Sequence, residues 1–523
     1  MGEIRYAMSY DIGTTGVKTC IFSIGDTIEL IAGASAGYNL YVLDGGGAEQ
    51  DPNEWWHAMC RTTGEVLSTS GISPDKIEGI SFCSQMQGLV LADKNGEPVR
   101  RAMSYMDQRA TEQLKKGIAH GPQIAGANVF KLLKSIAITG AVAASVKDPV
   151  WKYKWVEENE PENFKRVHKW LDVKDFLICK MTGEFSMTPD SAFATLLYDI
   201  KKECWSKPIC DMLGVNMAHL PEIKECTDKI GELTEKAAKE LGLKEGTAVF
   251  GGGGDASLIG VASGAVAPGE THLYWGTSGW AGTVTTKSVV DANAMIAAIV
   301  GADKGRFLYF AELETAGKCY EWVKNNVVSD RLGLYASHET VGDAFECMSK
   351  AASEVEVGSG GVIFAPWLHG NRCPFEDPNS RGMFFNLNLE TGKAELVRAV
   401  IEGVSYHLRW FVETQDKKVE TSDVVRFAGG GARSDVICQI LADILGRRVE
   451  VPFQPHNVGA AGAAVITAVG LGVVKDIQSA KKLIAIEKSF RPDMKKHAEY
   501  EKYYSVFTKL YKTNKKLFAQ LNK

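Results

Sequence analysis

The chain has 523 residues, which is enough for two large domains. Hydrophobic residues make up 45% of it and charged residues 24%, a globular composition that excludes disordered chains, collagen-like repeats and coiled-coil rods. Lys and Arg total 59 against 64 Asp and Glu, for a net charge of −5. Because the net charge is negative and no dense block of Lys and Arg occurs, we expect no nucleic-acid partner.

Cysteine usage and apolar segments indicate a reducing compartment and no membrane span. The 11 cysteines are an odd number, are scattered and include no C-x-x-C pair, which argues against a disulfide framework and a zinc site. The first residues lack the basic and apolar regions of a signal peptide. The longest apolar run, 459–474, has about 16 residues and is short for a span. We therefore expect a cytoplasmic protein in which this run forms a buried helix.

A strand–turn–strand pattern occurs twice. Near the N-terminus, β-rich segments at 5–10, 17–24 and 27–34 predict an antiparallel meander whose first turn is Asp11–Gly16. The pattern returns about half the chain later, and a repeat at this spacing is too long for a solenoid and predicts two related domains. The second copy consists of predicted strands at 271–275 and 280–286 around the turn Gly276–Gly279.

Predicted strands and helices alternate through both halves, which is typical of α/β layers. We place the domains at 1–262 and 263–523. The Lys-rich, amphipathic segment from Ile484 onward is predicted to be a helix that closes the second domain, with its charges facing solvent. The other predicted strands are 77–84, 247–250 and 424–428, with a short segment at 361–366, and the other predicted helices are 148–158, 173–181, 393–414 and those after Ser434 and Gly459.

The turn at Asp11–Gly16 combines glycines, threonine hydroxyls and a nearby lysine, Lys18. Such a turn exposes backbone N–H groups that bind phosphate oxygens, although a simple hairpin turn has the same composition. The second copy at Gly276–Gly279 favours the phosphate interpretation, because two facing hairpins can bind one polyphosphate from both sides. Asp11 has no acidic counterpart there, since Tyr274 takes its place, so we expect a metal in the first domain only.

Four successive glycines, Gly251–Gly254, lie between the predicted strand 247–250 and Asp255. One interpretation makes Asp255 the N-cap of a following helix. The glycines favour another, because they remove side chains from a loop and let a ligand approach the backbone. A carboxylate presented there can accept a proton from a substrate hydroxyl as that hydroxyl attacks phosphorus. We therefore favour a general base at Asp255 over a plain helix cap.

Three further segments end strands with glycines or polar groups. The run Gly429–Gly431 precedes Ser434, a pattern that fits contact with a nucleotide base or ribose and nearly as well fits tight strand-to-helix packing with Ser434 as a cap. Segments Ser84–Gly88 and Tyr105–Arg109 offer amide, carboxylate and guanidinium groups, which suit the paired hydroxyls of a polyol. Taken singly, each of these residues is more often a surface or turn residue.

Together these motifs resemble the FGGY family of carbohydrate kinases, and within it the xylulokinases most closely. The resemblance runs from about Tyr6 to Val474, nearly the whole chain. A chance match of so many ordered motifs is very improbable. The motifs are Asp11–Gly16, Glu49–Trp56, Gln85–Gly88, Gly252–Asp255, Gly276–Gly279 and Gly429–Ser434, joined by Lys174–Asp175, Met181–Glu184 and Phe364–Arg372.

The resemblance implies an α/β fold of two ribonuclease-H-like (actin-like ATPase) domains with a cleft between them. It implies ATP and Mg²⁺ as cofactors, with the sugar bound mainly by the first domain and ATP mainly by the second. Asp255 is the implied general base, and Asp11 and Asp255 are the implied Mg²⁺ ligands. The implied sugar-binding residues are Gln85, Met86, Gln87, Asp107, Asp255 and Ala256, and the implied ATP-binding residues are Gly13, Thr14, Thr15, Lys18, Gly276, Thr277, Ser278, Gly317, Glu321, Gly430 and Ser434.

Two departures from the xylulokinases concern the sugar. Xylulokinases usually carry His where this chain has Gln87 and Asn where it has Ala256. Gln keeps a hydrogen-bonding side chain without a titratable ring, and Ala has no polar side-chain atom. The hydroxyl pattern recognised by this chain can therefore differ from that of xylulose.

The resemblance implies ATP-dependent phosphorylation of a sugar or polyol hydroxyl, with conversion of D-xylulose to D-xylulose 5-phosphate as the expected reaction. The alternatives within the family are kinases for a tetritol, L-ribulose, gluconate or glycerol. The alternative of another class is a non-catalytic, actin-like nucleotide- or sugar-binding protein. A homodimer is compatible with the resemblance, because homodimers are common in the family.

Overall fold

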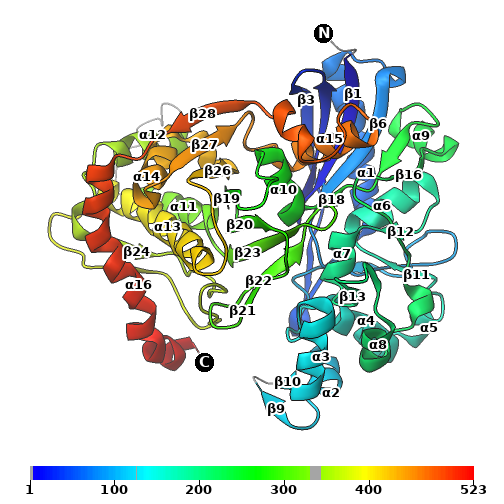
Figure 1. Cartoon of the computed structure of the whole chain (residues 1–523), viewed down its shortest axis with the longest axis horizontal. Helices are drawn as coiled ribbons and strands as arrows, with labels where there is room; N and C mark the ends of the chain where they lie inside the picture. The colour runs from blue at the N-terminus through cyan, green and yellow to red at the C-terminus, as the bar shows by residue number, and fades with distance from the viewer. Residues whose placement is uncertain (1–3, 125–126, 330–342, 523) are drawn as a thin grey trace. The chain divides into compact units, whose positions relative to one another are not determined.

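The computed structural model describes residues 4–124, 127–329 and 343–522. The chain forms two compact units (Figure 1). The first consists of Met1–Ala262, Ile299–Phe307 and Gly459–Ala485, and the second of Ser263–Ala298, Leu308–Val458 and Ile486–Lys523. Two segments that we placed in the second domain, 299–307 and 459–485, therefore belong to the first unit. Their assignment depends on contacts between distant parts of the chain, which local sequence patterns do not report.

The first unit is built on a mixed β-sheet. Its strands are β1 (Arg5–Ile12), β2 (Gly16–Ile24), β3 (Ile28–Gly37), β6 (Ile77–Ser84), β16 (Lys229–Glu232), β17 (Ala248–Phe250) and β18 (Gly253–Gly254). Their order is β16-β17-β6-β1-β2-β3, and β18 also pairs with β6. β1 is antiparallel to β2 and parallel to β6, so the turn after β1 and the end of β6 lie at the same edge of the sheet.

Helix α1 (Pro52–Ser70) packs on β2 and β3, and its sequence sets both of its ends. The Asp51 side chain accepts the Asn53 N–H at 2.9 Å, and Pro52 takes the first helical position. Gly71 ends the helix in a left-handed conformation. Trp55 of α1 packs edge-on against a phenylalanine of α6 (Val173–Thr182) in the core behind the sheet.

Smaller elements complete the first unit. The remaining helices are α2 (Thr111–Ile118), α3 (Val129–Thr139), α4 (Pro149–Asn159), α5 (Pro161–Phe164), α7 (Pro189–Ala194), α8 (Lys207–Leu213), α9 (Glu235–Leu241), α10 (Asp255–Ser263) and α15 (Val458–Gly470). The remaining strands are β4 (Tyr41–Leu43), β5 (Gly47–Gln50), β7 (Val90–Ala92), β8 (Ala102–Met103), β9 (Gln123–Ile124), β10 (Ala127–Asn128), β11 (Lys169–Leu171), β12 (Ser186–Met187), β13 (Tyr198–Asp199), β14 (Cys204–Trp205) and β15 (Glu222–Ile223). Most of the apolar run at 459–474 forms α15, as we predicted.

The second unit contains a sheet that repeats this topology. Its strands are β19 (Thr271–Trp275), β20 (Gly279–Thr285), β21 (Val290–Asp291), β22 (Ile296–Val300), β23 (Phe307–Leu313), β26 (Val424–Ala428), β27 (Arg448–Pro452) and β28 (Ile486–Phe490), in the order β21-β22-β23-β20-β19-β26-β27-β28. β19 is antiparallel to β20 and parallel to β26, as β1 is to β2 and β6. The two predicted strand–turn–strand segments therefore occupy equivalent places in two sheets.

The helices of the second unit surround a long central one. They are α11 (Gly317–Val323), α12 (Ala344–Ser353), α13 (Lys393–Asp416), α14 (Asp435–Leu445) and α16 (Met494–Asn522), with the hairpin β24 (Ile363–Ala365) and β25 (Met383–Phe385) beside α13. The prediction of a helix from Ile484 onward is wrong for its first residues, because β28 pairs antiparallel with β27 before α16 begins. No helix in the described part of the chain is long and apolar enough to cross a membrane.

Candidate active site

The turn between β1 and β2 is held by hydrogen bonds to its carbonyl groups. The Gly13 N–H donates to the Gly16 carbonyl at 2.9 Å, and the Tyr38 hydroxyl donates to the carbonyls of Gly13 at 2.5 Å and Gly16 at 3.0 Å. A Cβ on Gly16 would lie 2.9 Å from a carbonyl oxygen of β3, so glycine is needed there. Thr15 and Lys18 are exposed beside the turn. An ordered turn with an exposed hydroxyl and an ammonium group nearby suits a phosphate.

Amide side chains connect this turn to the end of β6. Gln85 Nε2 donates to Gln50 Oε1 at 3.0 Å, and Gln50 Nε2 donates to the Thr14 carbonyl at 2.6 Å. Gln85 is 5% exposed, and its Oε1 atom has no hydrogen-bond partner among the described residues. A buried oxygen of this kind can accept a hydrogen bond from a ligand, and a sugar hydroxyl is a suitable donor. The predicted sugar residue Gln85 and the predicted phosphate residue Thr14 are thus brought together.

Asp11 and Asp255 both lie near the buried thiol of Cys83. Burial raises the pKa of this thiol well above its usual value, and the negative charges of Asp11 and Asp255 raise it further. The pKa of Asp11 is also raised, chiefly by burial, while the charge of Lys18 opposes the shift. Gly459, in the first turn of α15, lies so close that a Cβ would be 2.6 Å from Asp11 Oδ2. The two predicted acidic residues therefore share one region of the first unit.

The chemistry of these donors fits Mg²⁺. This ion prefers oxygen ligands, and it is commonly held by one or two carboxylates together with substrate phosphates and water. Within residues 4–124, 127–329 and 343–522, no group of three or more His, Cys, Asp and Glu side chains could hold a metal ion. Asp11 and Asp255 would be the carboxylates of such a site, with phosphates of ATP and water as its other oxygen ligands.

The glycine run before Asp255 allows close approach of the backbone to neighbouring groups. Gly252 has a φ of 66°, and a Cβ there would lie 2.3 Å from the Phe82 carbonyl oxygen. A Cβ on Gly254 would lie 2.2 Å from Met86 Sδ. The glycine at position 254 thus lets Met86, at the end of β6, lie directly against the backbone that leads into Asp255.

Asp255 is half-buried and opens α10. Its Oδ1 atom accepts the Ala256 N–H at 2.8 Å, as expected of a residue at a helix start. The preceding peptide is fixed by the fully buried Asp190, whose Oδ2 accepts the Gly254 N–H at 2.7 Å. The role of Asp255 as a base stays a prediction.

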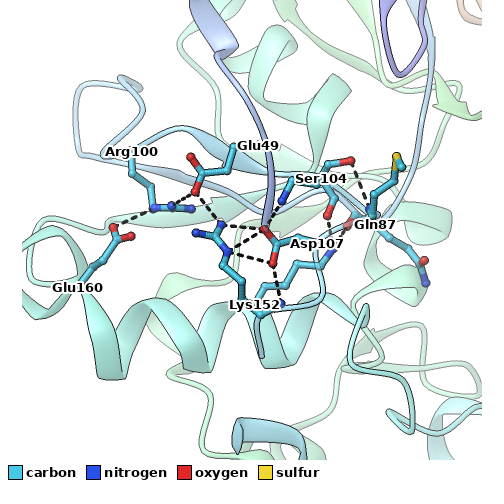
Figure 2. A network of polar contacts seen from close by, with 10 residues as sticks. Glu49, Gln87, Arg100, Ser104, Asp107, Lys152 and Glu160 are labelled. Atoms are coloured by element: carbon cyan, nitrogen blue, oxygen red, sulfur yellow. Dashed lines mark hydrogen bonds and ion pairs between the residues drawn. The ribbon is translucent and has the colours of Figure 1, made fainter. Parts of the chain in front are cut away.

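Asp107 is fully buried in a network of charged groups (Figure 2). Its Oδ2 accepts the Ala48 N–H at 2.8 Å and an N–H from Arg109 Nη2 at 2.7 Å, and its Oδ1 accepts the Arg109 backbone N–H at 3.1 Å. Arg109 also pairs with Glu49 at 2.6 Å, and Arg100 pairs with the same Glu49 carboxylate. Protein groups contact both oxygens of Asp107, and its predicted contact with a sugar stays a prediction.

Three charged residues of this region were missed as site residues from sequence. Glu49 lies in one of the family motifs, but no role was assigned to it from the sequence. Lys152, on α4, and Asp172, which caps α6, contact the backbone around Gln87. One sequence feature could have pointed to Lys152. This lysine lies between the aromatic residues Trp151 and Tyr153, which suggests that its cation is buried. The partners of that cation depend on the tertiary fold and could not be read from the sequence.

In the second unit, the turn between β19 and β20 contacts the start of α11. The Gly276 N–H donates to the Ser278 carbonyl at 3.0 Å, which closes the turn. The Gly317 N–H donates to the Gly276 carbonyl at 2.8 Å, and a Cβ on Gly317 would lie 2.4 Å from that oxygen. Thr277 is exposed at the tip of the turn. Glu321 lies one helical turn further along α11 and pairs with Lys318 at 2.7 Å.

The third glycine run lies against the end of β19. Gly429 has a φ of 96°, and a Cβ there would lie 2.5 Å from the Trp275 carbonyl oxygen. Gly431 lies against the Trp275 ring, where a Cβ would be 2.7 Å from the nearest ring atom. Ser434 caps α14, its Oγ accepting the Ile437 N–H at 3.4 Å. Tight packing and capping therefore both occur here, and the packing brings the glycine run to Trp275, the residue before the second turn.

Comparison with known protein families identifies the proteins that share the motifs and sheets described above. The model for the N-terminal domain of the FGGY family of carbohydrate kinases matches residues 6–261, and that for its C-terminal domain matches residues 273–471. The chain belongs to the FGGY family of carbohydrate kinases. The resemblance carried by the sequence motifs is thus confirmed, as is an α/β fold of the actin-like ATPase kind. FGGY kinases use ATP as phosphate donor.

Individual relatives differ in their named substrates. A xylulose kinase of Staphylococcus epidermidis is 29% identical to this chain and matches 98% of each sequence. A gluconokinase of Bacillus subtilis is 26% identical over 99% of this chain and 97% of its own length. A ligand-bound xylulose kinase from Lactobacillus acidophilus has a similar structure, with a TM-score of 0.86 and 23% identity over 99% of this chain and 100% of that one. The similarity to FGGY kinases therefore covers nearly the whole chain.

Proposed function

We propose that this FGGY kinase transfers the γ-phosphoryl group of ATP to D-xylulose and forms D-xylulose 5-phosphate. The observation that carries the proposal is the contact between Gly254 and Met86, because it places the polar end of β6 beside the backbone that presents Asp255. The similarity to curated xylulose kinases over nearly the whole chain supports the choice of sugar.

Each part of the site has a task in this reaction. Asp255 accepts the proton of the sugar hydroxyl, and the hydroxyl oxygen forms a bond to the γ-phosphorus while the bond from that phosphorus to the bridging oxygen of ADP breaks. Gln85 Oε1 accepts a hydrogen bond from another sugar hydroxyl. The turn with Thr14 and Thr15 orients the transferred phosphate. Asp11 and Asp255 would hold Mg²⁺, which would neutralise negative charge on the phosphates of ATP.

Gluconate is the second candidate substrate. The gluconokinase relative is nearly as similar to this chain as the xylulose kinase relatives are. Gln87 and Ala256, both near the proposed sugar site, differ from the residues usual in xylulokinases. A change from Asn to Ala removes a hydrogen-bond donor and an acceptor, so it can alter which hydroxyl pattern is preferred.

A coupled ADP-release assay with Mg·ATP tests this proposal. The panel contains D-xylulose, L-ribulose, gluconate, a tetritol and glycerol. We expect saturable turnover with the highest kcat/KM for D-xylulose. A higher kcat/KM for another member would contradict the proposed sugar while retaining the kinase. ATP binding without a phosphorylated product from any member would favour the non-catalytic alternative.

A further inference from the structure

The backbone of Gln87 has an unusual conformation. Its φ is 62°, in the left-handed region that residues other than glycine rarely adopt. Such a conformation persists only where the surrounding structure determines it, and it is common at ligand sites. The groups that hold this peptide therefore also set the direction of the Gln87 side chain, which is half-buried.

Asp172 holds the N–H side of this turn. Its Oδ2 accepts the Gln87 N–H at 3.1 Å, and its Oδ1 accepts the Gly88 N–H at 2.9 Å and the Val173 N–H at 2.8 Å. A Cβ on Gly88 would lie 3.0 Å from Asp172 Oδ1 and 2.8 Å from Val173 Cγ2. The start of α6 and the turn at Gln87 are therefore in direct contact.

Lys152 holds the carbonyl side. Its Nζ donates to the Gln87 carbonyl at 2.9 Å and to the Ser104 carbonyl at 2.7 Å (Figure 2). The side chain is fully buried, and burial lowers its pKa to about 8, while the charges of Asp107 and Asp172 oppose the shift. One ammonium group thus joins the Gln87 turn to the segment that leads into Asp107.

We propose that Lys152 is a positioning residue for sugar recognition, which acts by fixing the left-handed Gln87 peptide so that the Gln87 side chain faces the sugar. This inference rests on the proposed sugar kinase function. The cost of burying an ammonium group is offset here by two carbonyl partners from separate segments. An apolar residue could fill the same volume, but it would leave the carbonyls of Gln87 and Ser104 without this donor.

A double-mutant cycle of Lys152→Met and Gln87→Ala tests the inference with the full chain. We expect Lys152→Met to raise the KM for the sugar about tenfold and to leave the KM for ATP unchanged, because small misplacement of a substrate contact is costly. In the Gln87→Ala background, Lys152→Met should have no further effect on the sugar KM. A residue with only a structural role would instead change both KM values, or act equally in both backgrounds.

Lys154→Met is the matched control, because Lys154 lies on the same helix and also binds a backbone carbonyl, that of Gly214 at 3.1 Å. It should leave both KM values unchanged. If Lys152→Met does not fold, Lys152→Gln replaces it in the cycle, since an amide removes the charge and keeps two of the three N–H donors. If the wild-type protein turns over the sugar and the two substitutions act independently, the inference about Lys152 is contradicted while the proposed function stands. A wild-type protein without turnover on any sugar contradicts the proposed function, and the inference with it.

Discussion

Position 459 is occupied by glycine, and the lack of a Cβ there affects the geometry of the site. This glycine lies in the first turn of α15, where a Cβ would be 2.6 Å from Asp11 Oδ2 and 2.7 Å from Asp11 Cγ. A negative carboxylate at the first turn of a helix is also favoured by the helix dipole. The glycine therefore allows Asp11 to hold the position that we assign to a Mg²⁺ ligand.

Gly459→Ala should displace the Asp11 carboxylate. We expect kcat to fall at least tenfold at saturating sugar and ATP, and the Mg²⁺ concentration needed for half-maximal rate to rise, because the proposed ligand moves. Steady-state kinetics over a Mg²⁺ titration measures both quantities. Gly64→Ala in α1 is the control, since a Cβ there meets no atom within 4 Å. Unchanged Mg²⁺ dependence in Gly459→Ala would contradict the role of Asp11.

Residues whose role follows from local chemistry could be predicted, and residues whose role follows from distant contacts could not. Asp11 and Asp255 stand out because glycine-rich turns precede or follow them. Lys152 becomes important only when the fold brings Gln87 to it. The contacts of Asp107 with Arg109 and the Ala48 N–H also depend on the fold, because their positions in the sequence do not indicate them.

At the scale of elements, a buried ion pair within α13 is hydrogen-bonded to a tyrosine of α16. Arg398 Nε donates to Glu402 Oε1 at 2.8 Å, and Arg398 Nη2 donates to the Tyr500 hydroxyl at 2.8 Å. Tyr500 in turn donates to Glu402 Oε1 at 3.1 Å, and the Ser359 hydroxyl donates to Oε2 at 2.9 Å. Burial raises the pKa of Glu402, and Arg398 opposes the shift.

Arg398→Met should destabilise the second unit. It leaves the Glu402 carboxylate buried without its cation, a change that typically costs about 3–5 kcal/mol. Urea unfolding of both proteins at pH 7 measures the difference. Lys207→Met is the control, because the Lys207–Asp211 pair is exposed and such pairs contribute about 1 kcal/mol or less. Equal losses in the two variants would show that the buried pair contributes no more to stability than an exposed pair does.

Element prediction succeeded where periodicity and turn chemistry agree. The strand–turn–strand segments at β1–β2 and β19–β20 have local signals at both ends. β28 had no such signal, because its adjacent Glu487 and Lys488 resemble a helix surface. Its pairing with β27 brings together residues far apart in sequence. Pairing of this kind is decided by the tertiary fold.

For the whole molecule, buried neutral histidines make stability depend on pH. His407 is fully buried in α13, where its Nδ1 accepts the Trp367 Nε1–H at 3.3 Å and its Nε2 donates to the Cys373 carbonyl at 2.8 Å. Burial lowers the pKa of His407 to about 4 from its ordinary 6.5. Between these values the unfolded chain binds a proton that the folded chain does not, so the free energy of unfolding falls as the pH falls.

His407→Gln should weaken this dependence. The difference in pKa corresponds to roughly 3 kcal/mol lost on going from pH 7 to pH 4. A glutamine can donate to the Cys373 carbonyl and accept from Trp367 without titrating. Urea unfolding at several pH values between 7 and 4 gives the slope for each protein. A variant as acid-sensitive as the wild type would show that His407 does not contribute.

The division of the chain into two units is a property of the whole molecule. We expected one boundary at residue 262, but segments 299–307 and 459–485 cross back into the first unit. The second of them carries Gly459 and therefore contributes to the Asp11 region. The repeated sheet could be predicted from the sequence, whereas the assignment of segments 299–307 and 459–485 to the first unit required the fold.

The central claim is that Asp255 removes a proton from the sugar hydroxyl. The most direct test compares kcat for wild type and Asp255→Asn with the best substrate of the panel, alongside the thermal midpoint of each protein. We predict that kcat falls at least about a hundredfold, because an amide cannot accept the proton, while the thermal midpoint changes little. A folded Asp255→Asn protein with wild-type kcat would contradict the account.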